Sequence, residues 1–355
     1  MELKKKIAVL CDYRLMSERL GGMDRFFWLF DSECKAMGHQ IVWFFPNNPR
    51  VQDYSQLTIV TDNGKSVEQI FIDYNQSFDV VITHFLELCT SFYKTVKKEM
   101  LAAKIITVDH NPRPLGGYAF KKRIQKRMKG LLYSRYIDLY IGVSQYTLNE
   151  ILKDFGDHLS KKSIVIYNGI EYQKFKQSEN RATHAPKFLV ACHLRYSKGI
   201  QDLIDAVALL PKNILAQLQI DVYGEGENQT VLENKIKENN LLENFVFKGS
   251  VPNLHDIYFQ YDYLLQPTHM ECFSLAILES LSANVPVITT PVGGNEEVIK
   301  NGINGFILPV KNPQAWCDLI SKLYQGEMKI SGDTSELIAT EFSIEKMVSE
   351  YIKLL

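Results

Sequence analysis

The chain has 355 residues, of which 46% are hydrophobic and 23% are charged, and its formal net charge is −1. This length predicts two domains, each with its own core, and the near-neutral charge argues against a nucleic-acid partner. The six cysteines form no Cys-x-x-Cys pair, which predicts reduced thiols in a cytoplasmic protein and no zinc site. No stretch approaches 18 uninterrupted apolar residues, so no membrane-spanning helix is expected.

Short β-rich runs alternate with helical patterns along the chain. The strands predicted in the first half are 7–11, 40–45, 79–83, 104–108, 139–143 and 163–167. Those predicted in the second half are 188–192, 219–223, 245–247, 263–266 and 285–289. Because such continuous apolar strands need cover on both faces, the pattern predicts two doubly wound α/β domains with parallel sheets. The polar stretch 173–186 is the predicted linker.

Candidate ligand-binding residues follow several predicted strands, where parallel sheets bind their ligands. Gly21 and Gly22 open a helix after the first strand, where backbone amides can approach a phosphate, although a plain turn is the alternative. His110 follows the strand that ends at Val108, and a structural histidine is the alternative there.

The second half carries cations and glycines at equivalent places. His193, Arg195 and Lys198 follow the strand that ends at Cys192, and the last two could neutralise a diphosphate. Gly224 opens a Gly-x-Gly turn after the next strand, which would let the chain pass close to a nucleotide.

Two glutamates, Glu271 and Glu279, flank the start of a helix predicted from Ser274. The N–H groups of Phe273, Ser274 and Leu275 would face the same crevice, and a helix N-terminus attracts phosphate. One acid on a sugar, amides on a phosphate and a second acid on a ribose would together bind a nucleotide-sugar. Two solvated glutamates beside a core helix are the alternative interpretation.

These motifs have the order and spacing of a known family. Between residues 186 and 309 the chain resembles the nucleotide-sugar domain of the retaining family-four glycosyltransferases. The matching pieces are Lys198-Gly199, Gly224-x-Gly226, Glu271 with Glu279, Pro286-Val-Ile288, Gly293-Gly294, Glu297 and Asn304-Gly-Phe306. The first half matches more loosely, through Gly21-Gly22, His110, Val143-Ser144 and 166–170. Residues 341–351 resemble the family's C-terminal helix, which crosses back to the first domain.

The resemblance implies the GT-B fold, in which two Rossmann-like domains face each other across a cleft. Residues 1–172 would form an acceptor-binding domain with the C-terminal helix, about 341–355, packed back on it, and residues 173–340 would bind the nucleotide-sugar. The implied activity is that of a retaining, hexosyltransferase-type enzyme. It would move sugar from a UDP- or GDP-linked donor to a glycan or lipid-linked acceptor, in surface polysaccharide or glycoconjugate assembly.

The resemblance also implies residue roles. Glu271 would hold sugar hydroxyls, Glu279 would bind the ribose, and His110 would lie beside the reacting sugar. Lys198, with Arg195 and the helix amides, would stabilise the leaving phosphate, so neither a metal nor a further cofactor is expected.

The chain departs from the family at two places. Cys192-His193 stands where the family usually has Gly-Arg, so a guanidinium role is not carried over to His193. Cys272 stands where the family usually has glycine, and this replacement would alter the loop turn or narrow the sugar pocket.

The segment 119–133 is rich in lysine and arginine, and Phe120, Ile124, Met128 and Leu131 recur in it at helical spacing. Such a basic amphipathic helix either lies on an anionic bilayer or packs its apolar stripe on its own domain. The first alternative would place the protein peripherally at the inner face of the cell membrane, beside a lipid-linked acceptor.

Three other functions remain open at this point. A GT-B-fold UDP-sugar epimerase would convert its donor without an acceptor. A non-catalytic nucleotide-sugar-binding protein would bind the donor and transfer nothing. A Rossmann dehydrogenase is the weakest alternative, because no Gly-x-Gly-x-x-Gly follows the first strand.

Overall fold

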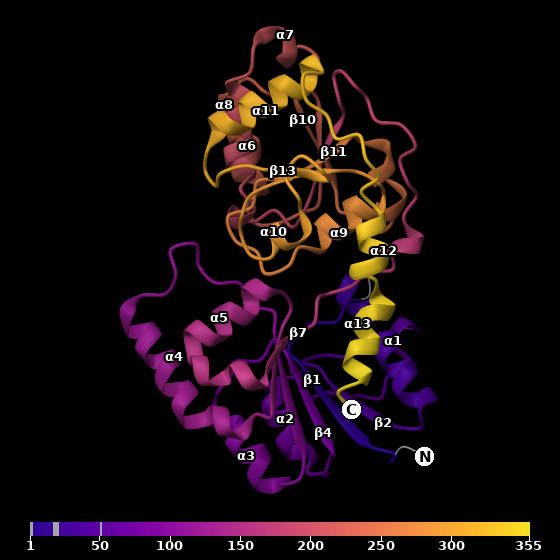
Figure 1. Cartoon of the computed structure of the whole chain (residues 1–355), viewed down its shortest axis with the longest axis vertical. Helices are drawn as coiled ribbons and strands as arrows, with labels where there is room; N and C mark the ends of the chain where they lie inside the picture. The colour runs from indigo at the N-terminus through magenta and orange to yellow at the C-terminus, as the bar shows by residue number, and fades with distance from the viewer. Residues whose placement is uncertain (1–2, 17–20, 50–51) are drawn as a thin grey trace. The chain divides into compact units, whose positions relative to one another are not determined.

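The computed structural model describes residues 3–16, 21–49 and 52–355. The chain divides into two compact units, which are described separately here (Figure 1). Unit 1 comprises residues 1–169 together with 344–355, and unit 2 comprises residues 170–343. The chain therefore passes between the units twice. Ile170 and Ser343, the first and last residues of unit 2, form a parallel β-bridge with each other.

Unit 1 contains a parallel seven-stranded sheet with the order β3-β2-β1-β4-β5-β6-β7. Its strands are β1 (Lys6–Cys11), β2 (Gln40–Phe44), β3 (Ile59–Val60), β4 (Val80–His84), β5 (Lys104–Asp109), β6 (Leu139–Gly142) and β7 (Ser163–Val165). Its helices are α1 (Gly22–Ala36), α2 (Val67–Tyr74), α3 (Ser91–Glu99), α4 (Phe120–Tyr133), α5 (Gln145–Phe155) and α13 (Ile344–Ile352). The central strands are buried on both faces, which explains their nearly continuous apolar sequences.

Unit 2 contains a parallel six-stranded sheet with the order β10-β9-β8-β11-β12-β13. Its strands are β8 (Phe188–Ala191), β9 (Ile220–Tyr223), β10 (Phe245–Gly249), β11 (Tyr263–Gln266), β12 (Val287–Thr289) and β13 (Gly305–Ile307). Its helices are α6 (Ile200–Ala208), α7 (Lys212–Leu215), α8 (Gln229–Glu238), α9 (Leu275–Ser282), α10 (Asn295–Val298), α11 (Pro313–Gln325) and α12 (Glu336–Glu341).

Both sheets reverse their strand order once, between β1 and β4 in unit 1 and between β8 and β11 in unit 2. In open α/β sheets the ligand crevice lies outside the carboxyl ends of the strands at this reversal. In unit 1, Gly21 lies in the loop after β1 and His110 follows β5, the neighbour of β4; in unit 2, Lys198 and Glu271 lie in the loops after β8 and β11. The topology therefore brings the candidate residues of each unit to one edge of its sheet.

The stretch 173–186, predicted as the linker, is part of unit 2. Arg181 explains why, because its guanidinium donates hydrogen bonds to the backbone carbonyls of Asn284, Ile330 and Gly332. The amide of Ala182 donates to Asp262, at 2.6 Å. These polar groups anchor the segment to unit 2, which begins at Ile170.

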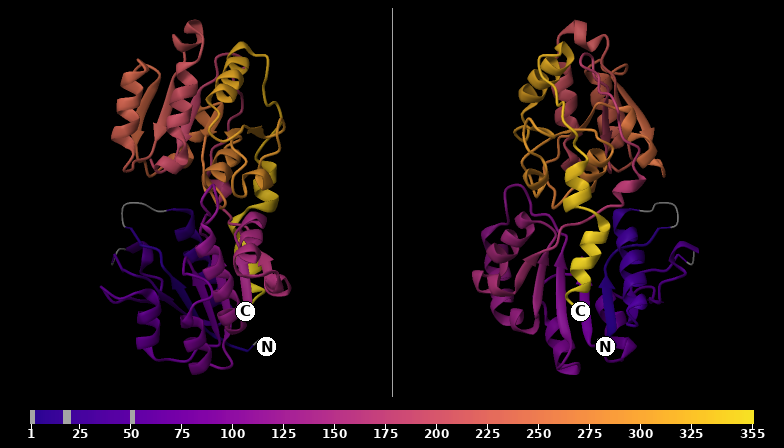
Figure 2. Two further views of the ribbon diagram at one scale, coloured as in Figure 1. Left: turned by 90° about the vertical axis from the view of Figure 1, so that its left-hand side faces the viewer. Right: turned by 45° about the vertical axis from the view of Figure 1, so that its right-hand side comes forward.

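The last helix, α13, completes unit 1 by packing on α1 (Figure 2). The Tyr351 ring is fully buried, with its centroid 4.9 Å from that of Phe26 and 5.9 Å from that of Phe30. The amide of Gly169 donates to the sulfur of Met347, which fixes the helix beside the end of the first segment of the unit.

Candidate functional site

A lysine and a glutamate form an ion pair at the carboxyl edge of the unit 2 sheet. Lys198 ends a short 3-10 helix, Tyr196–Lys198, in the loop after β8, and Glu271 lies in the loop between β11 and α9. Lys198 Nζ lies 2.6 Å from Glu271 Oε2, and the side chains are only 21% and 17% exposed. The fold thus joins two residues that the sequence separates by 73 positions.

Two glycines allow the loops after β8 and β12 to approach the loop that carries Glu271. Gly199 has a φ of +72°, and a Cβ there would overlap the carbonyl oxygen of Pro267. Gly293 has a φ of +60°, and a Cβ there would overlap the carbonyl oxygen of Glu271. Both positions therefore need glycine, for backbone conformation and for space.

We expect Gly199→Ala to destabilise unit 2 more than Gly302→Ala. Gly302 also has a positive φ, of +79°, but a Cβ there would meet no atom within 4 Å. In the control, Gly302→Ala, backbone strain alone should lower the free energy of unfolding by about 1–2 kcal/mol. In Gly199→Ala, the clash with the neighbouring loop should lower it by about 1–3 kcal/mol more. Urea unfolding of both variants measures the difference, and equal losses would contradict a close approach of the two loops.

Glu279 is held by a buried tyrosine. Its Oε2 accepts a hydrogen bond of 2.9 Å from the hydroxyl of Tyr258, in the 3-10 helix Tyr258–Gln260. Burial raises the pKa of Tyr258, and the neighbouring Glu279 carboxylate raises it further, so the hydroxyl remains a donor. Tyr258 was missed at the sequence level, because a tyrosine in an apolar segment gives no signal of its partner.

The helix that contains Glu279, α9, begins at Leu275, one residue later than predicted, with Ser274 as its N-cap residue. The hydroxyl of Ser274 accepts a hydrogen bond from Gln266 Nε2, at 2.5 Å, and does not cap the helix. The side chain therefore leaves the first-turn amides uncapped. Phe273 is buried, 4% exposed, so its side chain contributes to the core while its backbone lies at the start of the helix.

The remaining candidate residues of unit 2 lie on neighbouring loops. Gly224 has a φ of +118°, and a Cβ on it would overlap the carbonyl oxygen of Cys192, so the loop after β9 lies against the loop after β8. On the latter loop His193 is half-buried and Arg195 is exposed. Cys272 is buried and does not have a positive φ.

In unit 1, His110 is held by two residues at the end of β4. His84 Nδ1 lies 3.0 Å from His110 Nε2, and the ring of Phe85 stacks on that of His110 with a centroid distance of 4.2 Å. Burial lowers the pKa of His110 to about 3, and burial together with His110 lowers that of His84 far below its usual value. Both rings are therefore neutral near neutral pH.

In the Gly21-Gly22 turn, the amide of Gly21 donates to the carboxylate of Asp24 at 2.7 Å. Asp24 is fully buried and also accepts a hydrogen bond of 2.8 Å from Tyr54. Burial raises the pKa of Asp24 despite these hydrogen bonds. Gly22 is the first residue of α1, whose N-terminus thus already has a carboxylate partner.

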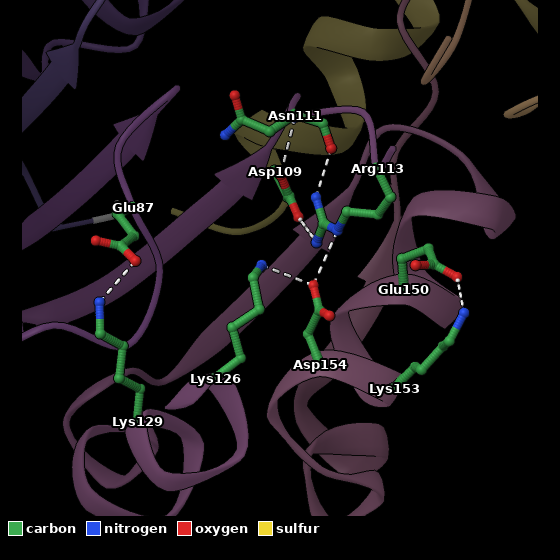
Figure 3. A network of polar contacts seen from close by, with 9 residues as sticks. All are labelled: Glu87, Asp109, Asn111, Arg113, Lys126, Lys129, Glu150, Lys153 and Asp154. Carbon is green, nitrogen blue, oxygen red and sulfur yellow. Dashed lines mark hydrogen bonds and ion pairs between the residues drawn. The ribbon is translucent and has the colours of Figure 1, made fainter. Parts of the chain in front are cut away.

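A buried charge network, which the sequence did not predict, ties α4 to the loop after His110 (Figure 3). Arg113 donates to Asp109 at 2.7 Å and to Asp154 at 2.9 Å, and Lys126 donates to Asp154 at 2.8 Å. Burial disfavours the guanidinium charge, but the two aspartates outweigh it and raise the pKa of Arg113. Lys126 Nζ also lies 4.4 Å from the ring centroid of Tyr118. The network was missed because Asp154 lies 41 positions from Arg113 and 28 positions from Lys126 in the sequence.

Helix α4 exposes its apolar stripe. Phe120, Ile124, Met128 and Leu131 are 75%, 49%, 50% and 63% exposed, so the alternative in which the stripe packs on its own domain is wrong. The buried side consists of Lys126 and Gly130, and a Cβ on Gly130 would overlap the carbonyl oxygen of Phe155. α4 therefore packs on α5 through Gly130 and the Lys126–Asp154 ion pair, and its apolar side chains remain exposed to solvent.

Within residues 3–16, 21–49 and 52–355, no three His, Cys, Asp or Glu side chains gather in a way that could hold a metal ion. In the same part of the chain, every helix is too short or too polar to cross a bilayer.

Several known proteins resemble this chain in sequence or in fold. Residues 171–336 match the model of the family described as Glycosyl transferases group 1. Two uncharacterized glycosyltransferases of Methanocaldococcus jannaschii are 26% and 25% identical, over 63% and 87% of this chain and 62% and 84% of their own lengths. HepE of Anabaena, solved with UDP and with UDP-glucose, is 17% identical in both complexes. The UDP complex superposes with a TM-score of 0.79 over 98% of this chain and 99% of HepE.

The structural similarity establishes the fold. The two parallel-sheet α/β units have the GT-B fold, as predicted. The family match and the relatives support a glycosyltransferase of group 1.

Proposed function

We propose that this chain is a retaining glycosyltransferase that moves a hexosyl group from a nucleotide-sugar to a glycan or lipid-linked acceptor. The observation that carries the proposal is the Lys198–Glu271 ion pair at the carboxyl edge of the unit 2 sheet. It puts a cation suited to a phosphate beside a carboxylate suited to sugar hydroxyls. Of the two expected donor classes, the UDP complexes of HepE favour a UDP-sugar.

The charges at this edge suit the departure of a nucleoside diphosphate. Breaking the bond between the anomeric carbon and the phosphate oxygen puts negative charge on the leaving group. Lys198 and the first-turn amides of α9 would stabilise that charge by preorganised electrostatics, with Arg195 as an exposed second cation. We propose that no divalent metal is needed for this step.

The sugar and ribose would be held by the two glutamates. Glu271 would turn from Lys198 to the sugar hydroxyls once the phosphate takes over the ammonium group. Glu279, held by Tyr258, would accept hydrogen bonds from the ribose. The resemblance gives His110 a place beside the reacting sugar. With retention by same-face attack, the acceptor oxygen bonds to the anomeric carbon, and its proton passes to the leaving phosphate.

A donor panel tests the proposal. We expect a UDP-sugar to raise the melting temperature by mass action and to be consumed with a saccharide acceptor, both in excess EDTA and without it. Full loss of transfer on chelation, restored by magnesium or manganese, would contradict a metal-independent leaving group. Incubation with donor alone separates the alternatives, since an epimerase yields the epimeric UDP-sugar and a binding protein yields no product.

We further propose that the exposed face of α4 lies on an anionic bilayer, where a lipid-linked acceptor would be reached. Its apolar stripe is open to solvent, and Lys121, Lys122, Arg123 and Arg127 are exposed beside it. A helix with an outward apolar face flanked by cations is suited to the interface of an anionic membrane. Lys126 is excluded from this contact, because it is buried against Asp154.

Reversing the charge of three exposed basic side chains on α4 should weaken binding to anionic vesicles. In Lys121→Glu/Arg123→Glu/Arg127→Glu, we expect partition onto phosphatidylserine vesicles to fall at least about 100-fold, because each basic residue contributes about 1 kcal/mol. Vesicle co-sedimentation at low and high salt measures this. The control changes three exposed lysines elsewhere, Lys98, Lys161 and Lys237, to glutamate and so alters net charge equally. Equal sedimentation of both variants and wild type would contradict the membrane contact.

A further inference from the structure

Two histidines lie side by side at the carboxyl edge of the unit 1 sheet. His84 is the last residue of β4 and is in register with Val108 of β5, two residues before His110. The 3.0 Å contact joins Nδ1 of His84 to Nε2 of His110. A hydrogen bond between two neutral imidazoles needs one proton between these nitrogens, so either ring can be the donor.

The surroundings of His84 favour one arrangement. The ring is fully buried, with centroid distances of 5.5 Å to Phe26 and 5.9 Å to Tyr351. Its Nε2 is buried and has no hydrogen-bond partner in the described part of the chain. A proton on Nε2 would thus be a buried donor without an acceptor, which is rarer in folded proteins than a buried acceptor without a donor. The proton of His84 therefore belongs on Nδ1.

This arrangement determines the state of His110. Because its Nε2 accepts the hydrogen bond from His84, the neutral ring carries its own proton on Nδ1. Phe85 fixes the plane of the same ring by stacking on it at an interplanar angle of 19°. Phe85 has a φ of +64°, an uncommon conformation for a bulky residue, which the surrounding structure must maintain.

We propose that His84 is a positioning residue that holds His110 in the tautomer with its proton on Nδ1. His110 then offers a hydrogen-bond donor, and not a base, to an oxygen of the bound sugar. The inference rests on the proposed function, which gives His110 its place beside that sugar. It also fits a reaction in which the leaving phosphate takes the acceptor proton, since His110 has no free lone pair on Nδ1 to receive it.

The tautomer can be measured directly in the full chain. Long-range proton–nitrogen NMR correlations of protein with isotope-labelled histidine distinguish protonated from bare ring nitrogens. The spectrum of His110→Gln identifies the His110 signals by their loss. At neutral pH we expect His110 to show a protonated Nδ1 and a bare Nε2. The reverse pattern would overturn the proposal.

Two substitutions of His84 test its role. His84→Asn retains a side-chain N–H near the place of Nδ1, whereas His84→Leu fills a similar volume without a donor. We expect asparagine to preserve the His110 tautomer and leucine to let the proton move to Nε2. With leucine, kcat/KM should fall about tenfold, the effect of one neutral hydrogen bond, and asparagine should restore most of it. An unchanged His110 spectrum in a folded leucine variant would overturn the proposal. If that variant does not fold, the wild-type and asparagine spectra decide.

The spectrum needs neither donor nor acceptor, so it separates this inference from the proposed function. A protonated Nδ1 in a protein that transfers no sugar would support the histidine arrangement and refute the transferase. A bare Nδ1 in an active transferase would refute the histidine arrangement and support the transferase.

Discussion

Lys198→Ala should lower kcat by about 10²–10³-fold, the effect of removing one preorganised donor to a developing negative charge. Its affinity for the nucleotide-sugar should fall by much less, because charge on the leaving phosphate grows only as the bond breaks. The side chain of Lys198 is 21% exposed, so in the alanine variant water cannot readily take over the role of the ammonium group in stabilising the phosphate. Steady-state kinetics and calorimetry separate the two quantities.

Two further variants make this result specific. Lys235 is 29% exposed and pairs with Asp205, so Lys235→Ala removes a comparable lysine away from the candidate site and should leave kcat unchanged. Glu279→Ala should instead weaken donor binding, and wild-type affinity in that variant would refute the ribose assignment. If Lys198→Ala loses affinity as strongly as rate, the lysine binds the ground state and has no special role in departure of the phosphate.

Asp154→Ala should cost about 3–5 kcal/mol of unit 1 stability, the usual effect of breaking a buried ion pair. Asp154 accepts hydrogen bonds from two cations, Arg113 and Lys126, whose side chains are 4% and 11% exposed. Without the carboxylate, the ammonium group of Lys126 is buried with no counter-charge. Urea unfolding, with hydrogen exchange over α4 and α5 to identify the unit that opens, measures the loss.

The same helix offers a matched control. Lys129 pairs with Glu87 at 2.6 Å, but these side chains are 24% and 54% exposed (Figure 3). Glu87→Ala should therefore cost about 0–1 kcal/mol, as solvent-exposed pairs do. Similar losses of unfolding free energy in Asp154→Ala and Glu87→Ala would show that burial does not increase the contribution of the network to stability.

The two sheets could be predicted from sequence because strands buried on both faces consist of continuous apolar residues. β11 has the bounds predicted for it, and β1 begins one residue earlier than expected. β3 and β13 were missed, since they have two and three residues and are too short for any periodicity. β12 begins two residues later than predicted, because apolar residues before a strand look the same as those within it.

The candidate site was only partly predictable. Residues that follow strands are recognisable, so Lys198 and Glu271 could be proposed, but their contact depends on how the loops fold. His84 could have been found by the strand-end argument that singled out His110, had both strand ends been considered. The sequence left open whether the apolar face of α4 is exposed, because an apolar stripe at helical spacing usually indicates the buried side. Here Gly130 and Lys126 form that side instead.

Because unit 1 is assembled from two separate pieces of chain, its folding is tied to the order of synthesis. At roughly 5–20 residues per second, a ribosome needs roughly 10–35 s to make residues 170–343, after the first segment and before α13. Throughout that interval Phe26, Phe30 and His84 lack the helix that later contacts them. While its second unit is being made, the nascent protein therefore leaves these residues of unit 1 uncovered, and chaperones that bind apolar surfaces would meet them at this stage.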